Sequence, residues 1–177
     1  LPFAAQDAAG NLSAASTSTD NSVSYDVFSP MVEINQAAGQ PDPTNASPIL
    51  FDVQFSEAVS GFTASDVAIS GMTGTPSVTV TGSGADYTVK VSSMTNLETV
   101  TASIPANAAL DAAGNGNTAS YSSDNSVTYD GVRPEVTIDQ AASQSDPTNA
   151  SPIVFDITFN KPVFFDDPFD IEISGLS

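Results

Sequence analysis

The chain has 177 residues, with 21 acidic and 3 basic side chains, a net charge of −18, and neither cysteine nor histidine. This charge balance excludes a nucleic-acid surface and a polybasic membrane patch, because both need clustered lysine and arginine. The missing residue types exclude disulfides, thiol chemistry, histidine-based catalytic triads and ordinary structural zinc sites. No stretch approaches the ~18 apolar residues that predict a membrane-spanning helix.

The sequence repeats itself. The string DPTNASPI begins at Asp42 and again at Asp146, 104 positions later. The same offset relates residues 7–11 to residues 111–115, both reading DAAGN, and residues 20–26 to residues 124–130. We therefore expect the end of one repeat in residues 1–26, a whole repeat in residues 27–130 and the start of another in residues 131–177. A unit of this length can bury its own core, so each repeat is expected to be a domain.

Within the whole repeat, apolar and polar residues alternate along short segments, a pattern typical of strands with one buried face. In chain order these segments lie near residues 32–34, 49–55, 78–80, 87–91, 100–104 and 127–129. Turn-forming residues separate them at 40–45 and 71–76, a glycine-rich hairpin is predicted at 82–86, and a long loop covers 105–117. Helical periodicity is nearly absent. The predicted fold is all-β: an antiparallel sandwich of immunoglobulin type, with about seven strands per repeat. Its predicted core is Ile49, Phe51, Val53, Phe55, Val78, Val80, Tyr87, Val89, Val91, Val100 and Ile104.

Aspartates in loops are the residues best suited to bind a ligand. In sandwiches strung end to end, the linker at residues 25–26 should meet the loop at 111–115, and the linker at 129–130 should leave beside the loop at 42–45. Each junction then gathers carboxylate and amide oxygens, which suit calcium. The spacing is not that of an EF-hand, and the same residues are ordinary turn formers without a metal. The candidate calcium ligands are Asp26, Asp42, Asp111, Asn115, Asp130 and Asp146.

Other reactive arrangements are weaker. Asp166 and Asp167 are adjacent, which favours a solvated turn over an acid–base pair. Lys90 lies between two valines of a strand and should face outward, which disfavours a core isopeptide bond. Residues 161–170 depart from their counterparts at 57–66: either they make a different contact with a neighbour, or Phe165 or Phe169 takes the core place of Phe62. No catalytic residue is predicted.

The strings DPTNASPI, FSEAVSGFTASDV, VTGSGADYTV, TASIPANAALDAAGN and DNSVTYD resemble the bacterial immunoglobulin-like repeats of large surface and secreted proteins. The resemblance covers the whole chain. It implies an extracellular location at the bacterial surface, no catalysis and frequent dependence on calcium. The leading hypothesis is a structural or adhesive segment of a surface protein or extracellular filament.

The alternative is a glycan-binding accessory module of a large secreted protein. The absence of tryptophan argues against it, since sugar sites usually use a stacking ring; residues 164–169 are its one candidate site. The expected partners are neighbouring repeats or like chains. These would cover the apolar faces of the partial repeats, to which Val23, Tyr25, Ile153, Phe155, Ile157 and Phe159 belong.

Overall fold

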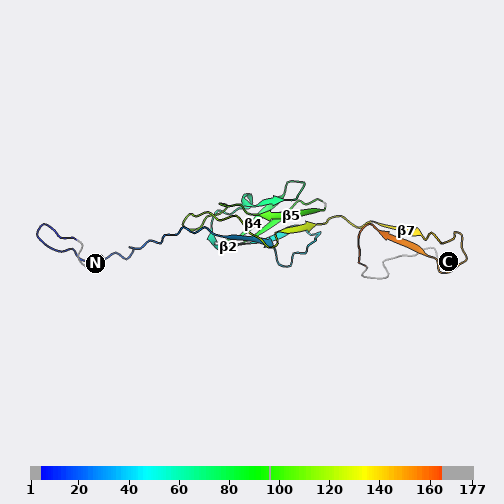
Figure 1. Cartoon of the computed structure of the whole chain (residues 1–177), viewed down its shortest axis with the longest axis horizontal. Helices are drawn as coiled ribbons and strands as arrows, with labels where there is room; N and C mark the ends of the chain where they lie inside the picture. The colour runs from blue at the N-terminus through cyan, green and yellow to red at the C-terminus, as the bar shows by residue number, and fades with distance from the viewer. Residues whose placement is uncertain (1–4, 96, 165–177) are drawn as a thin grey trace.

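The computed structural model describes residues 5–95 and 97–164. Apart from one 3-10 turn, η1 (Ala64–Asp66), the regular structure in this part of the chain is strand, which confirms the all-β prediction. Figure 1 shows a sandwich in the middle of the chain, an extended segment before it and a separate hairpin after it. The strands are β1 (Val32–Gln36), β2 (Ile49–Val59), β3 (Ala68–Ser70), β4 (Ser77–Ser92), β5 (Glu98–Ser103), β6 (Ser126–Tyr129), β7 (Val136–Gln140) and β8 (Phe155–Phe159).

Two antiparallel sheets face each other in the sandwich, in the orders β1-β2-β4 and β3-β5-β6. The predicted hairpin lies inside the long element β4, whose two ends lie together: the hydroxyl of Ser92 donates to the carbonyl of Ser77 at 3.4 Å. Near the turn the backbone is packed so tightly that a Cβ on Gly82 would lie 2.3 Å from the carbonyl oxygen of Asp86. With β4 folded back on itself, the first sheet has four strand segments and the second has three, the arrangement of an immunoglobulin constant-type domain.

The core forms where the alternating apolar residues of both sheets meet. In the register of β1 and β2, Ile34 lies opposite Val53, and in that of β2 and β4, Phe51 lies opposite Val89. Most of the predicted core is fully buried, including Phe51 and Phe55. Val78, Val80 and Tyr87 are only half-buried and pack at its margin. The two valines lie on the first arm of β4, at the edge of the wider sheet, where the narrower facing sheet covers them less. The buried residues also include Val32, Ile34, Val59, Phe62, Val67, Ala102, Ala109 and Val127.

Three aromatic rings pack edge to face at one end of the core. Phe62 lies 5.4 Å from Phe55 and 5.2 Å from Tyr87, measured between ring centroids. Such edge-on contacts are favourable because the positive ring edge meets the negative ring face. The hydroxyl of Tyr87 donates to the carbonyl of Val59 at 3.3 Å, which gives this partly buried polar group a partner.

The long loop at residues 105–118 is held by one buried side chain. Asn117 is 1% exposed. Its Oδ1 accepts from the amide of Ala109 at 2.7 Å, and its Nδ2 donates to the carbonyls of Pro105 at 3.0 Å and Thr118 at 2.6 Å. Ser60 and Leu110 exchange two main-chain hydrogen bonds, at 2.8 and 3.0 Å. The loop is thereby fixed against the end of β2.

The stretch from Thr118 to the end of β6 runs along the first strand in the parallel sense. Ile34 donates to the carbonyl of Tyr121 at 3.2 Å, and Tyr121 donates to that of Val32 at 3.1 Å. Further on, Thr44 forms a parallel bridge with Tyr129. The chain therefore enters the sandwich at one end and leaves it at the other (Figure 1).

The hairpin of β7 and β8 copies β1 and β2. Val136 pairs with Phe159 and Ile138 with Ile157, and these pairs correspond, at the 104-residue offset, to Val32 with Phe55 and Ile34 with Val53. The local pairing is thus a property of the repeated sequence. In the hairpin, however, the apolar side chains are uncovered: Ile138 is 55% exposed, whereas the corresponding Ile34 is fully buried. Residues 165–170 lie outside the described part, so the predictions for Phe165, Asp166, Asp167 and Phe169 stay predictions.

Candidate functional site

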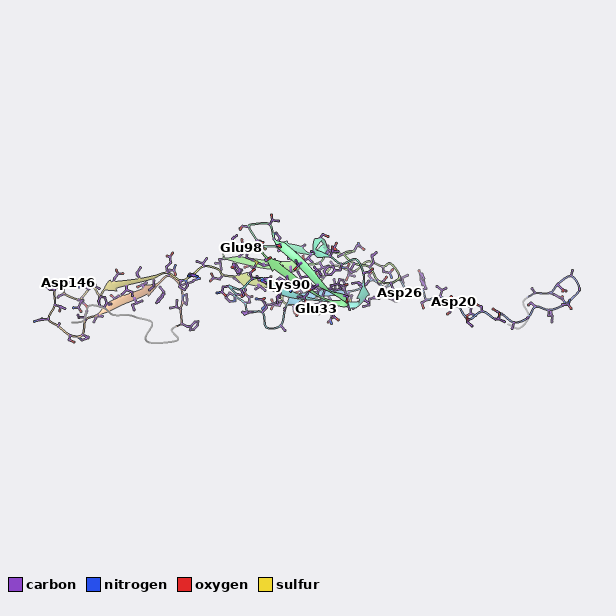
Figure 2. The ribbon with its side chains drawn as sticks, turned by 180° about the vertical axis from the view of Figure 1, so that it is seen from behind. Asp20, Asp26, Glu33, Lys90, Glu98 and Asp146 are labelled. Atoms are coloured by element: carbon purple, nitrogen blue, oxygen red, sulfur yellow. The ribbon has the colours of Figure 1, made fainter. Side chains whose placement is uncertain are left out.

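The candidate site lies where the linker reaches the sandwich. Asp26 is exposed and precedes β1. Its Oδ1 accepts a hydrogen bond from the amide of Phe28 at 3.0 Å, a local turn that the aspartate makes with its own backbone. Figure 2 shows Asp26 at one end of the sandwich.

The second part of the site is the loop at residues 111–115. Asp111 is buried, and its Oδ1 accepts from the amides of Ala113 and Asn115, both at 2.8 Å. Its Oδ2 accepts from the side-chain amide of Asn115 at 2.8 Å. These hydrogen bonds, led by the one from the Asn115 side chain, hold the pKa of Asp111 below its usual value, against the effect of burial. Asp111 is therefore an ionised carboxylate at neutral pH.

This loop is encoded locally. Residues 7–11 have the same sequence and the same bonds: Asp7 accepts from the amides of Ala9 and Asn11 at 2.9 and 2.8 Å, and from the Asn11 side chain at 2.8 Å. The pKa of Asp7 is lowered too, chiefly by the Asn11 side chain. Because the residues at 7–11 are exposed, the turn forms without support from a packed domain.

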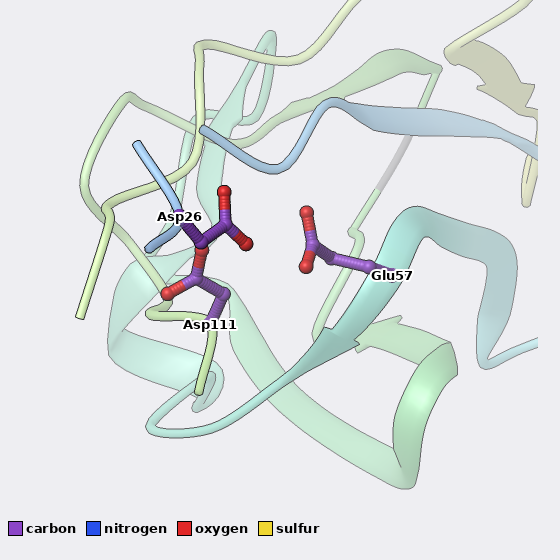
Figure 3. A group of neighbouring side chains, drawn as sticks. All are labelled: Asp26, Glu57 and Asp111. Carbon is purple, nitrogen blue, oxygen red and sulfur yellow. The ribbon is translucent and has the colours of Figure 1, made fainter. Parts of the chain in front are cut away.

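The sandwich brings a third carboxylate to these two. One carboxylate oxygen from each of Asp26, Glu57 and Asp111 lies within 4.8 Å of the other two. Figure 3 shows them converging from the linker, the end of β2 and the loop. In addition, the side-chain amide of Asn115 donates to the main-chain carbonyl of Asp26 at 3.3 Å, joining loop to linker. Three carboxylates this close repel one another unless a cation lies between them, and such oxygen donors suit a hard cation such as calcium.

The linker after the sandwich holds its aspartate differently. Asp130 donates its amide to the carbonyl of Thr44 at 2.8 Å, beside the loop at residues 42–45, as expected from the sequence. Its carboxylate, however, forms an ion pair with Lys161, with Nζ 2.9 Å from Oδ2 and 3.1 Å from Oδ1. The Lys161 ammonium holds the pKa of Asp130 below its usual value.

The remaining candidate ligands do not join a cluster of acidic groups within the described residues. Asp42 uses its Oδ1 to accept from the amide of Thr128 at 2.9 Å, a structural bond that ties its loop to β6. Asp146 is exposed and lies beyond the far end of the sandwich (Figure 2). Of the six candidate ligands, the structure therefore brings together Asp26, Asp111 and Asn115.

An open groove of about 570 Å³ crosses the outer face of the sheet β1-β2-β4. Amide and carboxylate side chains such as Asn35, Gln54 and Asp86 line it, together with Tyr87. The ring of Tyr87 is half-buried and packs edge to face with Phe55 and Phe62, so it belongs to the margin of the core and does not project as a stacking surface for a sugar. The groove thus offers polar groups to a glycan, as the alternative hypothesis requires, but no aromatic ring on which a sugar could stack.

Neither Glu57 nor Lys161 was among the predicted site residues. Glu57 reads as an ordinary polar residue of a strand, and only the folded chain carries it to Asp26. A signal was nevertheless present: Glu57 and Lys161 occupy the same position in successive repeats and have opposite charges. The residues that they face, Asp26 and Asp130, also occupy one repeated position, and both are negatively charged.

Comparison with known protein families supports the fold. A family described as Bacterial Ig-like domain matches residues 26–129. The searches of curated proteins and of solved structures gave no match. Within residues 5–95 and 97–164, no helix has the length and apolar character needed to cross a membrane.

Proposed function

Because the chain belongs to the bacterial Ig-like domain family, we propose that it is a structural or adhesive module of an extracellular or cell-surface protein. A module of this kind acts by projecting or holding other parts of a protein, and the proposal gives it no catalytic role. The observation that carries the proposal is the placement of the chain ends: the linker before β1 and the linker after β6 lie at opposite ends of the sandwich (Figure 1). Domains with this geometry project along a line when they follow one another.

We further propose that residues 1–26, 27–130 and 131–177 belong to three successive repeats. The shared register of β1–β2 and β7–β8 supports this division. The exposed face of the β7–β8 hairpin, with Phe155 at 55% exposure, corresponds to a face that is fully buried in the sandwich. Counterparts of β3, β5 and β6, from the same chain or from a like chain in a filament, would cover it.

Calcium is the proposed stiffener of the linker. Asp26, Glu57 and Asp111 would supply the carboxylates, with Asn115 holding the loop against the linker. Calcium takes six to eight oxygens, and water and main-chain carbonyls would complete the set. An ion bound by a linker residue and two residues of the sandwich would fix the direction in which the linker leaves.

Calorimetric melting of the whole chain in calcium and in chelator tests this proposal. We expect calcium to stabilise the sandwich by RT ln(1 + [L]/Kd), about 3 kcal/mol at a hundredfold excess over Kd. Asp111→Asn keeps the Oδ1 acceptor for the amides of Ala113 and Asn115 but removes the charge and the acceptor for the Asn115 side chain, so it should strongly weaken the response. Asp7→Asn is the matched control, because it changes the same turn away from the cluster, and it should respond as the unaltered chain does. Identical melting curves in calcium and in chelator would contradict the calcium proposal.

A further inference from the structure

The side chains that face the two linker aspartates have opposite charges. Glu57 and Lys161 correspond at the offset of 104 residues, as do Asp26 and Asp130. The two aspartates have the same local geometry: each accepts from the amide two residues later, Phe28 and Val132, at 3.0 Å in both cases. The local turn at the aspartate is therefore repeated, and the side chain that faces the carboxylate is reversed in charge.

At the second linker the aspartate is bound by the ammonium of Lys161. It contacts both carboxylate oxygens of Asp130, at 2.9 and 3.1 Å, and it also donates to the main-chain carbonyl of Val132. A carboxylate bound through both oxygens together with a nearby carbonyl oxygen is a donor set that calcium also uses. Lys161 and Asp130 are about 30% exposed, at 29% and 32%, so the pair is partly shielded from water.

We propose that Lys161 is a built-in replacement for the metal ion, so that position 57 and its counterpart 161 decide how each linker is held. A glutamate there gives a linker that needs a divalent cation, and a lysine gives one that is held without it. Two independent observations point to a cation at the glutamate-bearing linker. One is the close approach of Asp26, Glu57 and Asp111, and the other is the cationic group that the equivalent aspartate binds in the next repeat.

The two kinds of linker should differ in what controls them. A metal site is filled or empty according to the free calcium concentration. A lysine is attached to the chain and is always present, although salt screens its attraction to the aspartate. The inference rests on the proposed calcium role at Asp26, and it adds that calcium acts on that linker and not on the one at Asp130.

The rate of amide hydrogen exchange, measured on the full chain, reports on both linkers in one sample. The reporters are the amides of Phe28 and Val132, which bond to Asp26 and Asp130 in the same way. At free calcium about a hundred times its Kd, exchange at Phe28 should slow by up to about a hundredfold relative to chelator. Exchange at Val132 should stay unchanged.

Substitutions at positions 57 and 161 should then change whether each linker depends on calcium. Glu57→Lys should protect Phe28 in chelator and remove its calcium response. Glu57→Gln should weaken the response without adding that protection, which separates a bound ammonium from simple relief of repulsion. Asp52→Lys, an equal change of charge on the outer face of β2, should leave the calcium response intact.

At the other linker, Lys161→Met and Lys161→Glu should both speed exchange at Val132. Calcium should restore part of the protection in the glutamate variant, which then has two carboxylates where the first linker has three, and none in the methionine variant. Lys90→Glu controls for the change in net charge. If calcium slowed exchange at Phe28 but Glu57→Lys kept that response, or if calcium restored Lys161→Met and Lys161→Glu equally, the replacement role would be wrong. If calcium had no effect at Phe28 in the unaltered chain, the calcium proposal itself would fail.

Discussion

The buried Asn117 provides the sharpest test of how the site is supported. Replacing it with alanine removes one acceptor and two donors from a position that is 1% exposed. The amide of Ala109 and the carbonyls of Pro105 and Thr118 would each lose a bonding partner. At roughly 1 kcal/mol for each bond, with a further penalty for main-chain groups left unpaired, Asn117→Ala should lower the free energy of unfolding by about 3–4 kcal/mol. That is a large share of the 5–15 kcal/mol typical of a domain.

Urea unfolding of the full chain, followed by far-ultraviolet circular dichroism, measures this loss. For a slope of roughly 1.5 kcal/mol per molar urea, the midpoint should fall by about 2 M. Asn45→Ala is the control, since Asn45 is an exposed loop residue, and its effect should stay within about 0.5 kcal/mol. An equally small effect at Asn117 would show that the loop at residues 105–118 does not depend on its hydrogen bonds.

Asn117→Asp sharpens the test through pH. The introduced carboxylate would point an oxygen at the carbonyls of Pro105 and Thr118, which repel it. Its pKa in the folded state should therefore lie above the unfolded value of about 3.9. A raised folded pKa gives stability that is present below the unfolded pKa and is lost as pH rises. The deficit of this variant relative to the unaltered chain should be larger at neutral pH than at about pH 4.

Three further predictions concern the sandwich. Hydrogen bonds, led by the one from the Thr73 side chain, lower the pKa of Glu98 in the folded state from its ordinary value of 4.5. The stability that Glu98 contributes should therefore be present above pH 4.5 and should be lost as the pH falls through the lower pKa of the folded state. Glu98→Gln should flatten this part of the stability–pH curve, measured by urea unfolding. Phe62→Ala should cost about 3–5 kcal/mol by the same assay, because it removes a buried ring that contacts two others, and a cost below about 1 kcal/mol would contradict the packing. Gly82→Ala should destabilise more than Gly39→Ala in thermal melting: both glycines have positive φ, of 132° and 83°, but only at Gly82 would a Cβ collide with main-chain atoms. Equal melting temperatures for the two variants would show that the turn in β4 has room for a side chain.

The sandwich was predictable because burial on one face imposes a strict alternation. Shifting β2 by one residue against β1 would turn Phe51 and Val53 toward solvent, so the sequence pattern and the register determine each other. The glycines near residues 82–86 likewise predict the reversal inside β4. The half-burial of Val78 and Val80 could not be read from alternation, because it depends on the relative widths of the two sheets.

The candidate site was predictable where it depends on chain connectivity. The order of strands in an end-to-end sandwich places the linker beside the loop at residues 111–115, and Asn115 does contact Asp26. Glu57 was missed because nothing in a strand's own sequence tells which loop its end will meet. Whether Asp26, Asp111 and Asn115 bind calcium stays a prediction, as does the proposed role of Asp42, Asp130 and Asp146.

The parallel course of residues 118–130 along the start of the domain has a mechanical consequence. Hydrogen bonds at Ile34, Gln36 and Thr44 join the first part of the sandwich to its last part, at 3.2, 2.6 and 2.9 Å. When the two linkers are pulled apart, neighbouring parallel segments slide past each other, so these bonds are loaded in shear and must break together. An antiparallel pair pulled from one end would open bond by bond under a smaller force. The parallel pairing of residues 118–130 with the first part of the sandwich thus places these hydrogen bonds perpendicular to the direction of tension.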